Sequence, residues 1–301
     1  MKVLVTGGAG FIGSNLVDKL VELKHEVTVL DDLSTGKKEN INTNVNFIKC
    51  DISDKNDINI EYFENVELVF HMSALARVQM SIENPIPFHD KNVNGTLNVL
   101  ELSRLAKVRR FVFSSSSSIY GDTKQLPTTE KAEYNPISPY ALHKLIGEQY
   151  CRLYSELYDI ETVCLRYFNV YGERQLLEGA YCLVMGIFAN QIRNGKPMTI
   201  FGDGEQQRDF TYVGDVVQAN IKASMSKNVG SGEGINIGRG DCKSVNQLAD
   251  MIGGDRVYLD AVKEPRVTLA DNTLAKELLN WNPTMELEDW LPKYKEQLGI
   301  W

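Results

Sequence analysis

The sequence predicts an α/β protein built on a doubly wound parallel sheet of the Rossmann type, followed by a smaller mixed α/β lobe. Short, continuous apolar runs alternate with helical patterns through residue 167, and a glycine-rich turn joins the first run to the first helix. Such runs are typical of parallel strands that helices cover on both faces. The length of 301 residues allows one large domain or two modest ones.

The predicted strands of the sheet are short runs rich in β-branched and aromatic residues. They lie at residues 2–6, 26–30, 45–49, 68–71, 110–114 and 162–166. Between them, apolar residues recur at helical spacing, most clearly in residues 11–23, 92–106 and 139–158. Residues 1–167 are therefore expected to form the Rossmann domain.

The character of the chain changes after residue 167. Residues 168–301 are expected to form the smaller lobe, with an approximate boundary and with some later segments returning to the first domain. Short helices are expected at residues 214–225, 244–251 and 273–279, and the glycine-rich stretch 229–240 is expected to be a loop. Because no linker composition separates the two parts, we expect an extensive interface with a ligand cleft in it.

Composition and charge exclude several classes of protein. Hydrophobic residues make up 43% of the chain and charged residues 24%, which are ordinary globular values. The 32 Lys and Arg residues against 40 Asp and Glu residues give a net charge of −8, so no nucleic-acid partner is expected. No uncharged apolar run approaches the length of a membrane-spanning helix, so no membrane partner is expected either.

The spacing of cysteines and histidines predicts no metal site. The five cysteines lack a Cys-x-x-Cys pair, which argues against a structural zinc site and a disulfide framework and favours a reducing, cytoplasmic location. The four histidines show no ligand spacing. His71, at the end of a predicted strand, is expected to be a packed residue.

A glycine motif lies where the first strand meets the first helix. Gly7, Gly10 and Gly13 form G-x-x-G-x-x-G, and a G-x-G-x-x-G pattern starts at Gly8. Glycines there permit a tight turn and let backbone N–H groups approach a pyrophosphate at a helix N-terminus. An ordinary glycine-rich turn is the alternative, but the strand–turn–helix context favours dinucleotide binding.

Acidic residues at strand ends indicate which dinucleotide is bound. Asp31 ends the second strand, where its carboxylate can accept both ribose hydroxyls and would repel a 2′-phosphate. NAD is therefore favoured over NADP, although Lys37 and Lys38 lie nearby. Asp51 follows the third strand, where it could accept from the adenine amino group or cap the next turn.

A serine, a tyrosine and a lysine form the candidate catalytic group. Tyr140 and Lys144 are four residues apart on a predicted helix, so they share a face and the ammonium can lower the tyrosine pKa. Ser116 belongs to a serine run, residues 114–118, at a strand end that faces the ligand crevice. Ser115 is the alternative position. Tyr-x-x-x-Lys alone is a common accident, but here it follows a nucleotide motif and a serine-ended strand.

These motifs resemble, in order and spacing, those of the extended short-chain dehydrogenase/reductase family, and within it the sugar-nucleotide 4-epimerases such as UDP-galactose 4-epimerase. The resemblance extends over essentially the whole chain. Its pieces are Thr6-Gly-Gly-Ala-Gly-Phe-Ile-Gly13, Asp31-Asp-Leu-Ser-Thr-Gly36, Asp51-Ile52, His71-Met-Ser-Ala74, Asn92-Val-Asn-Gly-Thr96, the serine run, Tyr140 with Lys144, Arg166-Tyr-Phe-Asn169, Gly202-Asp-Gly204 and Arg208-Asp-Phe210.

The resemblance implies an NAD-dependent 4-epimerase of UDP-hexoses, with NAD regenerated in each cycle. Tyr140 would take the proton of the sugar 4-hydroxyl while C4 passes a hydride to NAD, and the hydride would return to the opposite face of the 4-keto sugar. Lys144 would bind the nicotinamide ribose and Ser116 the 4-oxygen. The implied NAD contacts are Gly7, Gly10, Phe11, Ile12, Gly13, Asp31, Asp32, Leu33, Ser34, Thr35, Gly36, Asp51, Ile52, Met72, Ser73, Ala74, Ala76, Asn92, Tyr140, Lys144 and Phe168.

The resemblance also implies that the smaller lobe binds the nucleotide of the substrate. Arg208 would bind the pyrophosphate, unless it forms a salt bridge with Asp209 or Asp203. Phe201 would stack on uracil, or simply pack in the core. The implied substrate contacts are Ser116, Ser117, Asn169, Thr199, Phe201, Arg208, Glu264, Arg266 and Thr268.

Four positions bear on the choice of reaction and sugar. Dehydratases and decarboxylases of the family carry acidic residues where this chain has Ser117 and Ser118, which favours simple redox at C4. Uronic-acid enzymes of the family commonly have threonine at the position of Asn169, so asparagine there makes UDP-glucuronate a less favoured substrate. Thr268 stands where epimerases restricted to plain hexoses have tyrosine, which leaves room for an N-acetyl group, so UDP-GlcNAc and UDP-GalNAc join UDP-glucose and UDP-galactose as expected substrates.

Other functions and an assembly remain open on the sequence. A UDP-glucuronate 4-epimerase or another NAD-dependent sugar-nucleotide oxidoreductase is the alternative enzyme, and a non-catalytic NAD-binding protein is the remote one. The resemblance implies a homodimer through residues 92–106 and 140–157. The apolar positions of these helices could equally cover the sheet.

Overall fold

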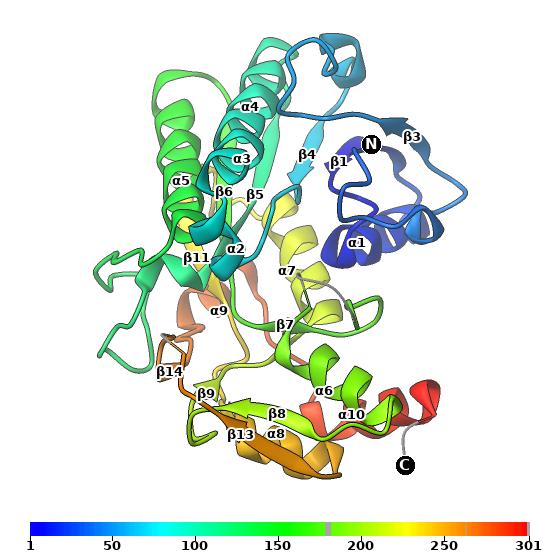
Figure 1. Ribbon diagram of the computed structural model, residues 1–301. Helices are drawn as coiled ribbons and strands as arrows, with labels where there is room; N and C mark the ends of the chain where they lie inside the picture. The colour runs from blue at the N-terminus through cyan, green and yellow to red at the C-terminus, as the bar shows by residue number, and fades with distance from the viewer. Residues whose placement is uncertain (178–181, 263, 300–301) are drawn as a thin grey trace.

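A parallel seven-stranded sheet forms the centre of the computed structural model, which describes residues 1–177, 182–262 and 264–299. The strand order is β11-β6-β5-β4-β1-β2-β3 (Figure 1). The order reverses between β1 and β4, which is where open α/β sheets bind ligands. The strands are β1 (Lys2–Thr6), β2 (Glu26–Asp31), β3 (Asn46–Lys49), β4 (Leu68–His71), β5 (Arg110–Ser116), β6 (Glu161–Tyr167) and β11 (Ser231–Ile237).

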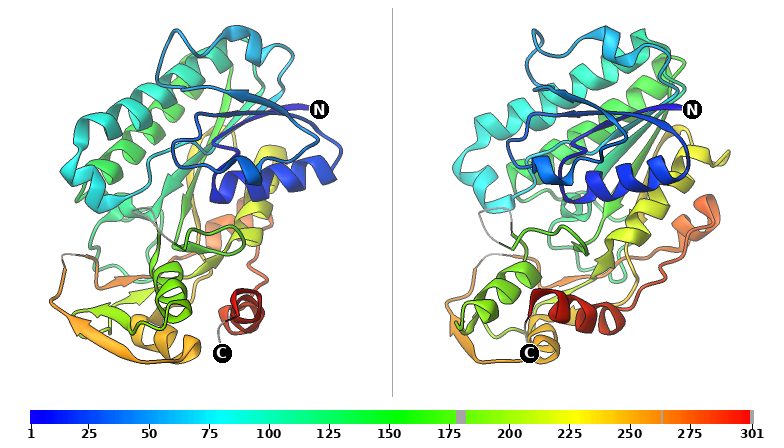
Figure 2. Two further views of the ribbon diagram at one scale, coloured as in Figure 1. Left: turned by 45° about the vertical axis from the view of Figure 1, so that its right-hand side comes forward. Right: turned by 90° about the vertical axis from the view of Figure 1, so that its right-hand side faces the viewer.

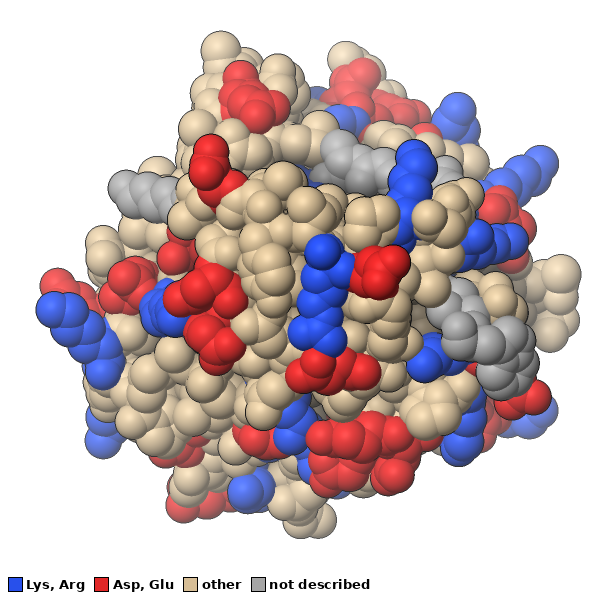
Figure 3. Space-filling model, turned by 60° about the horizontal axis from the view of Figure 1, so that its bottom comes forward, with Lys and Arg blue, Asp and Glu red and all other residues tan. Residues whose placement is uncertain are grey.

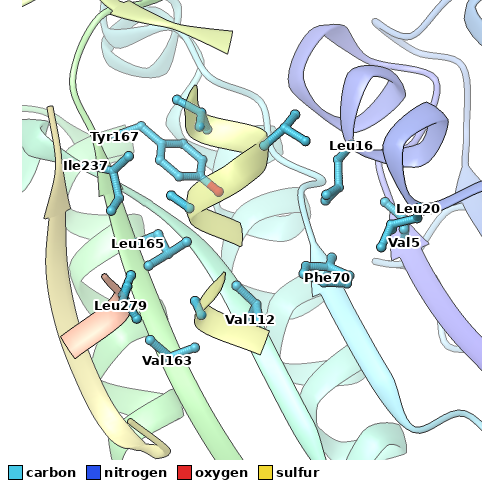
Figure 4. Close-up of a cluster of buried hydrophobic side chains, with 14 of the residues drawn as sticks. Val5, Leu16, Leu20, Phe70, Val112, Val163, Leu165, Tyr167, Ile237 and Leu279 are labelled. Carbon is cyan, nitrogen blue, oxygen red and sulfur yellow. The ribbon is translucent and has the colours of Figure 1, made fainter. Parts of the chain in front are cut away.

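Helices cover both faces of the sheet, which confirms the predicted doubly wound fold. One face carries α1 (Phe11–Glu22), α7 (Val213–Met225) and α9 (Thr273–Leu279), and their apolar side chains form one core with the sheet (Figure 4). The other face carries α4 (Gly95–Leu105) and α5 (Pro139–Leu157), which form a second core. The short helices α2 (Val78–Glu83) and α3 (Pro85–His89) pack on α5.

Local sequence explains how the helix with the candidate catalytic residues begins. Pro139 occupies the first turn of α5, where its missing N–H costs nothing, and Ser138 accepts a hydrogen bond from the backbone N–H of Ala141 at 3.2 Å. The helix predicted over residues 92–106 begins as a π-helical turn, Asp90–Asn94, and continues as α4 from Gly95. Three-residue and four-residue 3₁₀ turns lie at Lys38–Asn40, Ile60–Phe63 and Ser117–Tyr120.

The expectation of a loop at residues 229–240 is wrong, because β11 lies there and completes the sheet beside β6. Glycine composition is misleading here since the glycines serve close approach. A Cβ at Gly234 would lie 2.3 Å from the Arg166 guanidinium, and one at Gly232 would lie 2.5 Å from the Arg152 backbone. Ile235 and Ile237 are fully buried. The seven-stranded sheet therefore includes a strand that lies far beyond residue 167 in the sequence.

The smaller lobe lies below the sheet in Figure 1 and in both views of Figure 2. Helices α6 (Val184–Arg193), α8 (Val245–Ile252) and α10 (Leu287–Leu298) share a core with β8 (Met198–Phe201). The largely exposed strand β13 (Arg256–Leu259) pairs with β8 in parallel. The remaining strands are two-residue pieces: β7 (Val170–Tyr171), β9 (Gln207–Arg208), β10 (Thr211–Tyr212), β12 (Lys243–Ser244) and β14 (Val267–Thr268). β9 lies between β12 and β14, so its backbone is paired on both sides.

Candidate active site

A cavity of about 930 Å³ lies between the carboxyl ends of the sheet strands and the smaller lobe. Its walls include the turn after β1, the ends of β2 and β5, and the loop after β4. Residues of β8, β9 and β14 line it from the other lobe. The predicted cleft between the two parts of the chain is thus present, and its size suits more than one bound molecule.

The glycine turn forms the wall at the start of α1, and its geometry requires glycine. Gly7 has a φ of +70°, and a Cβ there would lie 2.7 Å from the backbone nitrogen of Ser73. A Cβ at Gly13 would lie 2.1 Å from the carbonyl oxygen of Gly7. Gly10 precedes α1 and supplies no side chain to cap it, which leaves the first N–H groups of the helix available to an anion. The residues present therefore fit a dinucleotide pyrophosphate.

Asp31 closes the next part of this wall. Its carboxylate accepts hydrogen bonds from the backbone N–H groups of Ala9 at 2.9 Å and Leu33 at 2.8 Å. Burial raises the pKa of Asp31, while these two bonds lower it in part. The carboxylate thereby ties the β2 end to the glycine turn at the predicted ribose position.

A lysine that the sequence reasoning missed lies beside Asp31. Lys91 Nζ lies 2.7 Å from Asp32 Oδ2 and 2.6 Å from Asp51 Oδ2, so it bridges the ends of β2 and β3. Burial acts to raise the pKa of both carboxyls, but the bonds from Lys91, with those from Ser34 and Ser53, lower it overall. Lys91 belongs to none of the motifs described above, and only the fold brings it to these strand ends.

The serine, tyrosine and lysine predicted as catalytic meet at the end of β5. Tyr140 and Ser116 both line the cavity, and the Ser116 hydroxyl lies close enough to the phenol to lower its pKa in part. Lys144 Nζ donates to the carbonyl of Ser114 at 2.6 Å and lies 5.9 Å from the centre of the Tyr140 ring. Burial lowers the pKa of Lys144 to about 8.

The electrostatics of Tyr140 differ from the expectation. We expected the ammonium of Lys144 to lower the tyrosine pKa, but burial raises it, and the lowering contribution comes from the nearby Ser116 hydroxyl. The reason is geometric, because the Lys144 ammonium bonds to the β5 backbone rather than to the phenol.

The structure separates the two serines that the sequence left as alternatives. Ser115 is buried and donates to Glu148 Oε1 at 2.5 Å, and Glu148 is paired with Arg166 at 2.7 Å. Ser116, the next residue along β5, lines the cavity together with Tyr140 instead. Successive residues of a strand point to opposite sides, which accounts for the division.

The opposite wall, from the smaller lobe, is made of side chains that bond to each other. Arg208 Nη2 lies 2.6 Å from Glu264 Oε2, and Gln206 Nε2 donates to Glu264 Oε1 at 3.2 Å. Asn169 Nδ2 donates to Thr268 Oγ1 at 3.0 Å. Arg208 therefore pairs with neither of the partners considered as alternatives, Asp209 and Asp203.

Most of the predicted contact residues line this cavity, and five do not. Leu33 and Gly36 belong to the turn after β2 but do not line the cavity. Asn92 bonds to both backbone groups of Leu75 and so shapes the loop after β4. Phe168 is buried in a small core, and Arg266 forms an exposed bidentate pair with Asp203 at 2.8 and 2.9 Å.

The other predicted residues are placed as follows. Cofactor contacts that line the cavity are Gly7, Gly10, Phe11, Ile12, Gly13, Asp31, Asp32, Ser34, Thr35, Asp51, Ile52, Met72, Ser73, Ala74, Ala76, Tyr140 and Lys144. Substrate contacts that line it are Ser116, Ser117, Asn169, Thr199, Phe201, Arg208, Glu264 and Thr268. His71, predicted to be packed, is buried between Thr6 and Thr96, and burial lowers its pKa to about 3.

The described part of the chain shows no metal-binding cluster and no membrane-spanning helix. Residues 1–177, 182–262 and 264–299 hold no group of three His, Cys, Asp or Glu side chains placed to bind a metal ion. None of the helices in these residues combines the length and apolar character needed to cross a bilayer. On the face shown in Figure 3, basic and acidic side chains lie next to one another rather than in separate areas.

The parallel sheet, the glycine turn and the Ser116–Tyr140–Lys144 group define a dinucleotide-dependent protein of the short-chain dehydrogenase/reductase class. More narrowly, the chain belongs to the NAD-dependent epimerase/dehydratase family, whose model matches residues 3–238. NAD is thus the cofactor, as predicted.

Known proteins of similar sequence and structure cover nearly the whole chain. A UDP-glucose 4-epimerase of Mycolicibacterium smegmatis is 39% identical, over 98% of each chain. The crystal structure of a UDP-glucose 4-epimerase from Thermotoga maritima with UDP-glucose is 39% identical with a TM-score of 0.91, and the match covers 99% of this chain and 100% of that one. A UDP-N-acetylglucosamine 4-epimerase from Methanobrevibacter ruminantium, in complex with UDP-N-acetylmuramic acid, is 36% identical with a TM-score of 0.90, covering 99% and 95%.

Proposed function

We propose that this protein is an NAD-dependent 4-epimerase of UDP-hexoses that interconverts UDP-glucose and UDP-galactose and also accepts their N-acetylamino counterparts. The observation that carries the proposal is the position of Ser116 and Tyr140 in the cavity that both lobes line. A sugar held there by its nucleotide in the smaller lobe meets a proton acceptor and the cofactor wall at once.

The residues of this group divide the work of moving one proton. Tyr140 accepts the proton of the sugar 4-hydroxyl, and the Ser116 hydroxyl beside it in the cavity relays it and holds the 4-oxygen. Lys144, fixed on the carbonyl of Ser114, supplies a buried positive charge beside the ring. When bound, NAD accepts the hydride of C4 and returns it to the other face of the sugar.

The carboxylates of the cavity favour simple redox at C4 over elimination. Among the described lining residues, the carboxylates are Asp31, Asp32 and Asp51 on the cofactor wall and Glu264, which is paired with Arg208. The positions directly after Ser116 are Ser117 and Ser118. A dehydration or decarboxylation needs a further acid or base at the sugar, which these serines do not supply.

The smaller lobe is proposed to bind the uridine diphosphate. A guanidinium offers paired donors to phosphate oxygens, which suits Arg208, and the Glu264 carboxylate can accept from two ribose hydroxyls. Phe201 is 42% exposed, so it does not serve merely as core packing and has a free face for a base. Arg266 is left out of this proposal because its guanidinium is bound to Asp203 outside the cavity.

The small side chain of Thr268 and the name of one relative support acceptance of an N-acetyl group. Thr268 is small and lines the cavity, and its hydroxyl bonds to Asn169 rather than filling the space. The Methanobrevibacter ruminantium relative acts on UDP-N-acetylglucosamine by its name. The small side chain is the local feature that permits the larger sugar.

Product analysis tests the proposed function directly. The purified protein is incubated with NAD and, separately, with UDP-glucose, UDP-N-acetylglucosamine and UDP-glucuronate, and the 4-epimers are resolved by chromatography. We expect epimers of the first two without accumulation of NADH. Stoichiometric NADH would indicate a net oxidoreductase, epimerised UDP-glucuronate a uronate epimerase, and three unchanged sugars with bound NAD a binding protein.

A homodimer and a cytoplasmic location complete the proposal. Helices α4 and α5 lie side by side (Figures 1 and 2) and expose Leu105, Leu142, Leu153 and Leu157, an apolar face that a second copy would cover. All five cysteines are free, which suits a reducing compartment. Light scattering should give twice the mass of the chain, and Leu153→Glu should give the monomer mass.

A further inference from the structure

The ion pair between Arg208 and Glu264 lies inside the cavity rather than beside it. The Arg208 side chain is only 11% exposed, whereas Glu264 is 36% exposed, and both line the cavity. Gln206 holds the second carboxylate oxygen and also donates to the carbonyl of Phe201 at 3.0 Å. A carboxylate is thus fixed against the guanidinium that a phosphate would need.

The two partners differ in how far they can move. Arg208 belongs to β9, whose backbone is paired with β12 on one side and β14 on the other. Glu264 precedes β14 and belongs to no strand. A ligand that takes the bond from Arg208 Nη2 would therefore compete with Glu264, the partner that no strand holds.

We propose that Glu264 is a specificity-determining residue: its carboxylate occupies the anion position at Arg208 and yields it only to a diphosphate that also carries ribose hydroxyls. This inference rests on the proposed function, in which Arg208 binds the diphosphate of the substrate. Glu264 then both excludes bare anions and recognises the nucleoside.

The physical basis is competition for one cation. Carboxylate and phosphate oxygens are alternative acceptors of the same charge-assisted hydrogen bonds. A bare anion that takes Arg208 leaves the Glu264 carboxylate without that bond in a half-buried position, which is unfavourable. A nucleoside diphosphate restores the lost bond because its two ribose hydroxyls donate to the released carboxylate. Discrimination comes from the contact that the wrong ligand cannot replace.

The relative affinities for inorganic pyrophosphate and UDP test the proposal. Glu264→Gln keeps the size of the side chain and removes its charge. In calorimetric titrations at saturating NAD, which fills the anion position at α1, the variant should bind inorganic pyrophosphate about tenfold more tightly than the wild type, since one charge-assisted bond no longer competes. Its preference for UDP over inorganic pyrophosphate should fall, because the ribose hydroxyls of UDP lose a charged acceptor.

A matched control separates this effect from a change in overall charge. Asp203→Asn removes the same charge from the same lobe, at an ion pair whose two members are 58% exposed and lie outside the cavity. It should leave both affinities unchanged. If it tightens pyrophosphate binding as much as Glu264→Gln does, the effect is long-range and the proposal is wrong.

A third variant distinguishes failure of this inference from failure of the proposed function. Arg208→Gln should weaken UDP binding strongly and abolish the gain when combined with Glu264→Gln. Unchanged pyrophosphate affinity in Glu264→Gln, with UDP binding still dependent on Arg208, would overturn the inference alone. UDP binding that does not depend on Arg208 would overturn the proposed diphosphate site, and the inference with it.

Discussion

The two walls of the cavity are built in different ways. The cofactor wall consists of backbone that a continuous stretch of sequence shapes: a glycine turn, the start of α1 and the end of β2, tied together by Asp31. The opposite wall consists of side chains on two-residue strands that hold one another, as Arg208 holds Glu264. A backbone wall is rigid and recognises a common cofactor, whereas a side-chain wall can rearrange for a substrate that enters and leaves.

The largest effect is expected where the two walls meet, at Tyr140. Tyr140→Phe removes the proton acceptor and nothing else, so turnover should fall by roughly two orders of magnitude or more while NAD and UDP still bind. Chromatographic rates and calorimetry measure the two quantities. Tyr134→Phe is the control, because its hydroxyl bonds to Arg166 away from the cavity. Wild-type turnover in Tyr140→Phe would remove the proposed base.

Substitutions in the glycine turn test whether the cofactor wall is as rigid as its contacts imply. Gly13→Ala places a Cβ 2.1 Å from the Gly7 carbonyl oxygen, so the variant should lose about 1–3 kcal/mol of stability and most of its NAD affinity. Gly10→Ala meets the same oxygen at 3.2 Å with an ordinary φ, so it should keep its stability. Equal melting temperatures for the two variants would show that the turn adapts.

Lys144 allows the cost of the catalytic arrangement to be measured through pH. Its pKa is about 8 when folded and about 10.5 when unfolded, so below pH 8 the buried ammonium destabilises the protein, and stability rises between these values as the unfolded chain binds more protons. Lys144→Met should therefore raise the free energy of unfolding of the cofactor-free protein at pH 7 by roughly 1–3 kcal/mol, which is measured as a higher melting temperature. The difference should shrink toward pH 10, and a constant difference would contradict a titrating lysine.

The smallest effect is expected from the one part of the cofactor wall that side chains build. Lys91→Met leaves Asp32 and Asp51 without their shared cation, so NAD affinity should fall by roughly three- to tenfold, as for a half-exposed ion pair. Turnover at saturating NAD should not change. Lys19→Met, which removes a cation paired with Glu22 outside the cavity, is the matched control and should alter neither.

The same contrast explains what the sequence could predict. The sheet, the glycine turn and the Tyr140–Lys144 pair follow from periods and motifs that are local in sequence, and the structure contains each of them. Lys91 and the Arg208–Glu264 pair depend on contacts between distant segments, for which no local pattern exists. Arg266 shows the same limit: the resemblance implied a substrate contact, but no local pattern indicates its exposed pair with Asp203 outside the cavity.

The strand β11 also bears on how the chain folds during synthesis. It pairs with β6 although residues 168–230 separate them, and its isoleucines join the apolar cluster that includes Leu165 and Trp281. Until the ribosome has released residue 237, the nascent sheet presents the edge of β6 and an uncovered apolar face, both of which invite association with other chains. A fragment ending at residue 167 should therefore aggregate rather than fold, and the last third of the chain decides when the first two thirds become soluble.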